Sequence, residues 1–167
     1  SVERVSMQKD IIELAQRLGQ VLQAKNWLAA TAESCTGGGV AYAITAISGS
    51  SAWFDRSFVT YTNEAKQQML GVTASTLETC GAVSEAVVRE MTAGTLAHSQ
   101  ANIAVAISGI AGPTGGSEER PVGTVWIAWQ TCEGEARAER YLFSGDREQV
   151  RLQAIREALS GLLSFSE

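Results

Sequence analysis

The sequence predicts an α/β fold, a single three-layer α/β/α domain with a mixed, mostly parallel central sheet. Three observations support it. Helical and extended patterns alternate along the 167 residues, as they do when helices cover both faces of a sheet. The segment 102–108 is continuously apolar, which is typical of a central strand buried on both faces. Two extended segments, 124–131 and 137–143, follow one another as a hairpin, so the sheet is mixed.

Apolar spacing and turn residues define the remaining elements. The expected helices are 7–25, 38–47, 63–70, 73–79, 84–98 and a last one that begins after residues 144–146. The expected strands are 28–32, 56–62 and the three segments given above. Ser84 is expected to cap its helix, and His98 lies at the end of that helix, where a histidine suits the helix dipole. One domain is expected over 1–167, with residues 1–6 flexible.

Composition excludes several classes of protein. The net charge of −5, with no run of Lys or Arg, predicts no binding to nucleic acid. No apolar stretch approaches a membrane-spanning length, and the N-terminus has no secretory signal, so no membrane partner is expected. Three widely spaced cysteines indicate free thiols in a reducing cytoplasm. A single histidine rules out a histidine-rich zinc site.

Residues 31–39 (TAESCTGGG) join a short strand to a helix and contain hydroxyls, a thiol and three consecutive glycines. A helix start offers unpaired N–H groups, and glycines let a ligand approach the backbone. A nucleophile placed there, Ser34 or Cys35, would have oxyanion donors nearby. The alternative is that Ser34 and Thr36 are ordinary helix caps in a tight turn. From the residues alone, both interpretations stay open.

A second glycine-rich segment, 108–116, follows the apolar strand and continues as a loop to Gly123. Long loops after a buried strand are usually functional or mobile. Neither segment contains a P-loop or a G-x-G-x-x-G motif, which argues against a P-loop NTPase and weakens a dinucleotide-binding interpretation.

The sequence contains few candidates for a base that could activate a serine. His98 is interpreted as structural, which argues against a Ser-His-Asp triad. A desolvated lysine can replace the histidine, and Lys66 lies in the first turn of the helix that follows Tyr61. Both residues are placed to face the sheet edge where Ser34 leaves its strand. The alternatives are a solvated helical lysine and a tyrosine at the edge of the core.

Six motifs together resemble the CinA C-terminal-domain family, and they occur in order from about residue 10 to 160. They are AESCTGG at 32–38, FVTYTNEAK at 58–66, GAVSE at 81–85, SGIAGP at 108–113, PVGTVW at 121–126 and FSGDR at 143–147. The chain is similar to the stand-alone amidases of this family rather than to its two-domain members. The resemblance implies a nicotinamide-nucleotide amidase, which converts nicotinamide mononucleotide to nicotinate mononucleotide and ammonia in pyridine nucleotide recycling.

The resemblance also implies the site residues. Ser34 corresponds to the nucleophile, and Tyr61 and Lys66 correspond to the residues that assist proton transfer. Backbone N–H groups of 36–38 are expected to hold the oxyanion. The substrate-binding candidates are Thr36, Gly37, Gly38, Asn63, Ser108, Gly109 and Ala111. No metal and no cofactor are expected, because N–H groups can polarise the carbonyl.

Two other functions remain open. The chain could be a nucleotide-binding or partner-binding module that keeps the fold without the reaction, or an amidase acting on a related carboxamide nucleotide. Trp126 and Trp129, on opposite faces of one strand, predict an apolar surface that is covered in a homodimer or higher homo-oligomer. Trp27 and Trp53 are interpreted as packing residues. Arg147, Ser50 and Ser51 are alternative ligands of the substrate phosphate.

Overall fold

The computed structural model describes the backbone of residues 2–167 and the side chains from residue 9 onward. Its five-stranded sheet has the strand order β2-β1-β3-β4-β5. The strands are β1 (Ala29–Glu33), β2 (Phe54–Val59), β3 (Ile103–Gly109), β4 (Thr124–Thr131) and β5 (Arg137–Leu142). β1 pairs in parallel with β2 and β3, whereas β4 is antiparallel to both β3 and β5. The predicted mixed sheet is confirmed.

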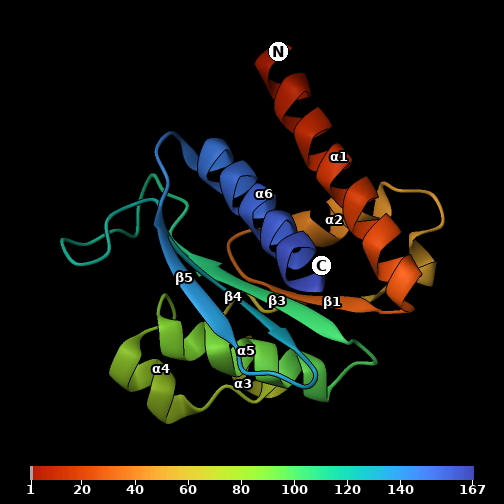
Figure 1. Cartoon of the computed structure of the whole chain (residues 1–167). Coiled ribbons are helices and arrows are strands. Elements are labelled where there is room, and N and C mark those ends of the chain that lie inside the picture. Colours follow the sequence, from red (N-terminus) through yellow and green to blue (C-terminus); the bar gives the residue numbers. More distant parts are fainter. Residues whose placement is uncertain (1) are drawn as a thin grey trace.

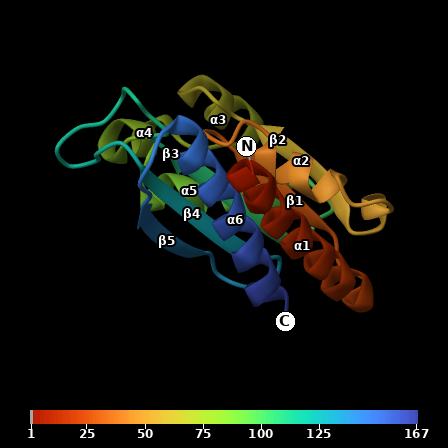
Figure 2. The ribbon, with the colours of Figure 1, turned by 90° about the horizontal axis from the view of Figure 1, so that it is seen from above.

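Helices cover both faces of the sheet, as predicted (Figure 1). They are α1 (Val2–Lys25), α2 (Gly39–Thr45), α3 (Asn63–Leu70), α4 (Ala74–Cys80), α5 (Glu85–Ala97) and α6 (Arg147–Ser166). Figures 1 and 2 show α1, α2 and α6 on one face and α3, α4 and α5 on the other. None of the helices in the described part of the chain is long and apolar enough to cross a membrane.

The main differences from the prediction concern α1, a short 3-10 helix and β2. α1 begins at Val2, not at residue 7. Ser1 lies outside the described residues, and the predicted flexibility of residues 1–6 stays a prediction. A short 3-10 helix, Ser50–Ala52, was not predicted. β2 covers Phe54–Val59 instead of 56–62, because Thr62 leaves the sheet and caps α3 by accepting a hydrogen bond from the Ala65 N–H.

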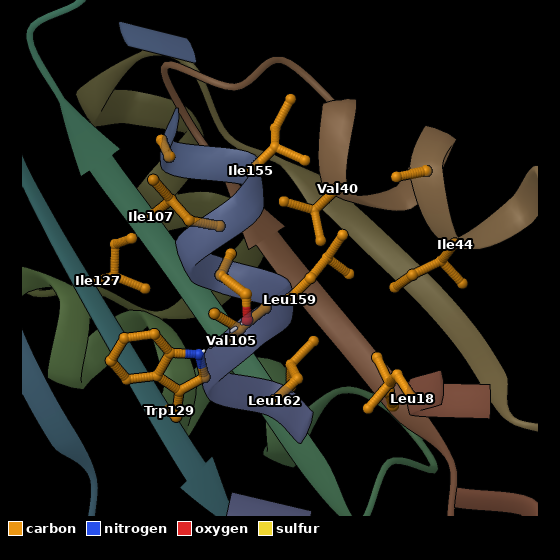
Figure 3. Packing of buried hydrophobic residues seen from close by; sticks show 14 of the residues in the cluster. Leu18, Val40, Ile44, Val105, Ile107, Ile127, Trp129, Ile155, Leu159 and Leu162 are labelled. Atoms are coloured by element: carbon orange, nitrogen blue, oxygen red, sulfur yellow. Dashed lines mark hydrogen bonds between the residues drawn. The ribbon is translucent and has the colours of Figure 1, made fainter. Parts of the chain in front are cut away.

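The two faces of the sheet carry side chains of different size. Alanines pair across neighbouring strands on the face toward α5, and they are Ala32, Ala106, Ala128 and Ala138. Small residues let α5 pack close to the sheet. The opposite face carries Val105, Ile107 and Ile127, which pack against Leu159 and other residues of α6 (Figure 3). On the face that carries the alanines, α5 therefore contacts β1, β3 and β4.

Trp129 corrects one prediction. This side chain is only 3% exposed and packs beneath α6, where its indole N–H donates to the Ala158 carbonyl at 3.0 Å (Figure 3). Trp126 is partly buried against the α5 face. Trp129 therefore leaves no apolar surface, because the chain's own last helix covers it. Trp53 is a fully buried packing residue, as expected, and Trp27 is partly buried against the core.

Candidate active site

The chain turns sharply where β1 ends. Ser34, the first residue after β1, anchors the turn by donating its N–H to the Ile107 carbonyl of β3 at 3.1 Å. Gly37 and Gly38 then adopt φ values of +59° and +94°, in the left-handed region that favours glycine. The Gly37 N–H donates to the Ser34 carbonyl at 3.0 Å. The turn leaves the Ser34 side chain, only 7% exposed, at the end of the parallel strands.

Lys66 reaches this serine from the first turn of α3. Its Nζ lies 3.0 Å from Ser34 Oγ, 2.9 Å from the Thr60 carbonyl oxygen and 3.3 Å from the Tyr61 carbonyl oxygen. The lysine is 1% exposed, and no ion pair to it occurs among the residues with described side chains. Burial lowers the pKa of Lys66 below its usual value, with the nearby Cys35 opposing this shift.

The three oxygen partners of Lys66 can accept the three N–H groups of an ammonium, and they are also compatible with a neutral amine. A neutral amine has two N–H groups and one lone pair, whereas an ammonium has three N–H groups and no lone pair. Two N–H groups can be donated to the carbonyls of Thr60 and Tyr61, and the lone pair can accept the Ser34 hydroxyl proton. The arrangement supplies a serine with an adjacent base and no histidine.

Tyr61 approaches this pair through its backbone. Its carbonyl oxygen is within 3.5 Å of Ser34 Oγ. Its phenol ring is 60% exposed, and the hydroxyl accepts a hydrogen bond from Arg147 Nη2 at 3.3 Å. The Tyr61 side chain therefore meets Arg147 at the cavity wall, while the Tyr61 carbonyl contacts the serine and lysine. The expected help of the Tyr61 phenol in proton transfer stays a prediction.

A cavity of about 330 Å³ opens in front of Ser34 and Lys66. Four of the predicted substrate-binding residues line it, and they are Asn63, Ser108, Gly109 and Ala111. The structure does not bring Thr36, Gly37 and Gly38 to this cavity, because they line a second cavity between α1, α2 and α6. The Thr36 hydroxyl donates to the Glu33 carboxylate at 2.7 Å. The Gly37 N–H is already bonded to the Ser34 carbonyl.

Arg147 brings a cation to the cavity wall. It is the first residue of α6, which Asp146 caps, and its Nη1 donates to the Gly112 carbonyl at 2.7 Å. Of the three candidates for a phosphate ligand, only Arg147 lines this cavity; Ser50 and Ser51 lie in the 3-10 helix. Within the described residues, no three His, Cys, Asp or Glu side chains are grouped as a metal site would require.

Cys35 lines the same cavity beside Ser34 but is a poor rival nucleophile. Burial raises the pKa of its thiol to about 11, although the nearby Arg151 guanidinium opposes the shift. The thiolate is the reactive form of cysteine, and it is scarce at neutral pH when the pKa is this high.

Sequence reasoning did not assign a role to Glu33 or Arg151. Both hold the turn after β1. Glu33 is fully buried, and five donor groups lie within hydrogen-bond distance of its carboxylate. Arg151 of α6 donates to the carbonyls of Cys35 and Thr36 at 3.0 and 3.4 Å. A signal for Glu33 was present, since a charged residue ends an otherwise uncharged, fully buried strand.

Comparisons with known proteins show the family to which the chain belongs. The family model of the CinA C-terminal domain matches residues 11–166. The chain belongs to the CinA C-terminal domain family. It is 58% identical over 153 residues to the nicotinamide-nucleotide amidohydrolase PncC of Escherichia coli K12, covering 92% of this chain and 93% of that protein. The PncC of Pseudomonas putida is 52% identical over 155 residues, covering 93% and 96% of the two chains.

Solved structures show the same fold. The competence/damage inducible protein CihA from Agrobacterium tumefaciens superposes with a TM-score of 0.93 at 46% identity, covering 95% of this chain and 96% of that one. The structural likeness therefore extends over nearly the whole of both chains.

Proposed function

We propose that this protein is an amidase that hydrolyses nicotinamide mononucleotide to nicotinate mononucleotide and ammonia. The observation that carries the proposal is the 3.0 Å contact between the buried Lys66 amine and the Ser34 hydroxyl, facing a cavity. A pure binding site needs no such base. The names of the PncC relatives, at 52–58% identity over most of the chain, support the choice of substrate.

The first half of the reaction forms an acyl-enzyme. Ser34 Oγ attacks the carboxamide carbon while its proton passes to neutral Lys66. The Cys35 N–H, at the start of the turn, is our candidate donor to the oxyanion. The carbon–nitrogen bond then breaks, and the leaving nitrogen takes the proton from Lys66 and departs as ammonia. The product of this half is a nicotinate ester of Ser34, and Lys66 is neutral again.

The second half consumes one water. Lys66 accepts a proton from the water, which attacks the ester carbonyl, and the proton is returned to Ser34 Oγ as the ester breaks. Burial supports this cycle because it lowers the pKa of Lys66 and keeps the amine able to accept a proton. The cationic pyridinium ring of the substrate activates its carboxamide and disfavours a second positive charge on Lys66.

The cavity wall offers recognition at both ends of a mononucleotide. Arg147 supplies a guanidinium that can pair with the phosphate. Tyr61 and Asn63 lie on the same wall, and a tyrosine ring attracts a cationic ring such as pyridinium. We further propose a role in pyridine nucleotide recycling. A location in the cytoplasm is consistent with the three free cysteines. Homo-oligomer formation stays a prediction.

A substrate panel tests the proposal. Ammonia release is measured with nicotinamide mononucleotide, nicotinamide riboside and nicotinamide, and binding of the mononucleotide is measured by calorimetry. We expect turnover of the mononucleotide and much weaker turnover of the two smaller amides. Binding without ammonia release would instead indicate a nucleotide-binding module, and faster turnover of nicotinamide riboside or nicotinamide would make that smaller amide the better substrate.

A further inference from the structure

Glu33 is a buried carboxylate directly before the nucleophile, and the reaction steps above do not use it. It is the last residue of β1 and is 0% exposed. Charged side chains are almost never fully buried unless they are paired. No ion pair to Glu33 occurs among the residues with described side chains, so hydrogen bonds must compensate for its burial.

Five donor groups surround the carboxylate. Oε1 accepts from Thr36 Oγ1 at 2.7 Å and from the Val40 N–H at 2.9 Å. Oε2 accepts from the Ala41 N–H at 2.9 Å and lies 3.1 and 3.3 Å from the hydroxyls of Thr31 and Ser57. These two hydroxyls are 2.6 Å apart, and because each has one proton, Thr31 donates either to the carboxylate or to Ser57, which donates to the carboxylate in turn. An ionised carboxylate only accepts hydrogen bonds, so this set of partners matches its charged form.

These partners divide into those in the sheet and those in the turn and α2. Thr31 and Ser57 belong to the paired strands β1 and β2. Thr36 lies in the turn, and Val40 and Ala41 provide N–H groups in the first turn of α2, whose N-cap residue makes no side-chain cap of its own. The Glu33 carboxylate therefore caps α2 from a distance and joins both α2 and the turn to the sheet.

The turn needs such a connection because its own backbone is permissive. Gly37 and Gly38 both have positive φ, and glycine restricts the chain less than any other residue. Ser34 directly follows Glu33 and precedes these glycines. A shift of the turn would change the 3.0 Å contact between Ser34 Oγ and Lys66 Nζ, on which proton transfer depends.

We infer that Glu33 is a positioning residue, whose carboxylate holds the turn after β1 so that Ser34 Oγ stays aligned with Lys66 Nζ. The inference rests on the proposed amidase function. Its distinctive consequence is a loss of rate at the serine with little loss of substrate binding, because Glu33 does not line the cavity.

Three variants test this role. Glu33→Gln keeps the shape but removes the charge and turns an N–H group toward the donors. Thr36→Val removes one hydroxyl on the turn side of the carboxylate, and Ser57→Ala removes one hydroxyl on the sheet side. We expect Glu33→Gln and Thr36→Val to lower kcat, by up to the order of 10²-fold, with KM changed by less than about threefold. Ser57→Ala is expected to keep kcat within about threefold of the parent.

A second readout does not depend on the natural substrate. The rate at which a fluorophosphonate probe labels Ser34 is measured at a temperature well below unfolding, with circular dichroism as the check on folding. We expect labelling to fall in parallel with kcat in Glu33→Gln and Thr36→Val. A purely structural Glu33 would lower the unfolding temperature only, so parental kcat and labelling in folded Glu33→Gln would overturn the inference.

The outcomes separate the two proposals. If the parent releases no ammonia but labelling of Ser34 falls in the variants, the proposed substrate is wrong and the positioning role is supported. If Glu33→Gln does not fold, the comparison of Thr36→Val with Ser57→Ala decides alone. Equal effects of these two variants on kcat and labelling would contradict a role in holding the turn.

Discussion

Lys66 and Ser34 are 32 residues apart in the sequence, yet the lysine Nζ lies 3.0 Å from the serine Oγ in the protein interior. The lysine reaches the serine because α3 begins shortly after β2, and β2 is the parallel neighbour of β1. Its 1% exposure removes water from the amine and lowers its pKa. Lys66 is therefore our candidate for the base that takes the Ser34 proton.

Lys66→Met tests the base. Methionine keeps the apolar length of the side chain and removes the amine, so ammonia release should fall by about 10²- to 10⁴-fold, the usual contribution of a general base. In the parent, kcat/KM should rise with pH as Lys66 loses its proton. A variant that retains this rise and most of its activity would exclude Lys66 as the base.

The same substitution should change how stability depends on pH. The pKa of Lys66 is lower in the folded than in the unfolded protein, so the unfolded state binds more protons between the two values. Parental stability relative to Lys66→Met should therefore rise with pH until the unfolded lysine has also lost its proton, and should be lowest below the folded pKa. Denaturant unfolding at several pH values measures this difference; a difference that is constant with pH would contradict it.

Arg147→Ala tests recognition of the phosphate. Loss of a charged hydrogen bond should raise KM for nicotinamide mononucleotide on the order of 10- to 100-fold, with a smaller effect on kcat. The substitution should have little effect with nicotinamide riboside, which has no phosphate. Arg140→Ala removes the same charge from an exposed residue that does not line the cavity and serves as the control. Equal losses with both substrates would assign Arg147 another role.

Cys35 is expected to be dispensable for the chemistry. Its thiol pKa of about 11 keeps it protonated at neutral pH, so Cys35→Ala should change kcat/KM by no more than about threefold. Iodoacetamide, followed by peptide mass spectrometry, should label the exposed Cys132 and leave the buried Cys35 unmodified. Rapid labelling of Cys35 together with loss of activity would contradict this expectation.

Gly94 tests the close packing of α5. A Cβ at this position would lie 2.0 Å from the Leu70 carbonyl oxygen, so Gly94→Ala should destabilise the protein by about 1–3 kcal/mol despite the higher helix propensity of alanine. The neighbouring Ala93 is exposed, and Ala93→Gly should cost about 1 kcal/mol from propensity alone. Urea unfolding compares the two; a stabilised Gly94→Ala variant would show that α5 can move away from α3.

Local patterns predicted the elements well, because they depend on neighbouring residues. The apolar run of β3, the cap Ser84, the end of α5 at His98 and the start of α6 after residues 144–146 all agree with the structure. Predicted element boundaries were wrong where a residue type suits two structural roles. The threonines after Val59 favour a strand by composition, yet Thr62 caps α3 because its hydroxyl can satisfy a helix N–H.

The site was predictable only in part. Placing Ser34 and Lys66 at one sheet edge follows from a parallel arrangement of β1 and β2, which sequence can suggest. The roles of Glu33 and Arg151 depend on contacts with α2 and α6 that no local pattern contains. Trp129 was assigned to an outer surface for the same reason, since only the tertiary fold shows that α6 covers it.

Ammonia release from nicotinamide mononucleotide by Ser34→Ala, measured beside the parent and Cys35→Ala, tests whether Ser34 is the nucleophile. All three proteins are first shown to be folded and to bind the nucleotide. We expect the rate of ammonia release to fall by at least about 10³-fold in Ser34→Ala and to stay near the parental rate in Cys35→Ala. Substantial turnover by Ser34→Ala would contradict the role of Ser34, because the nucleophile would then be another group.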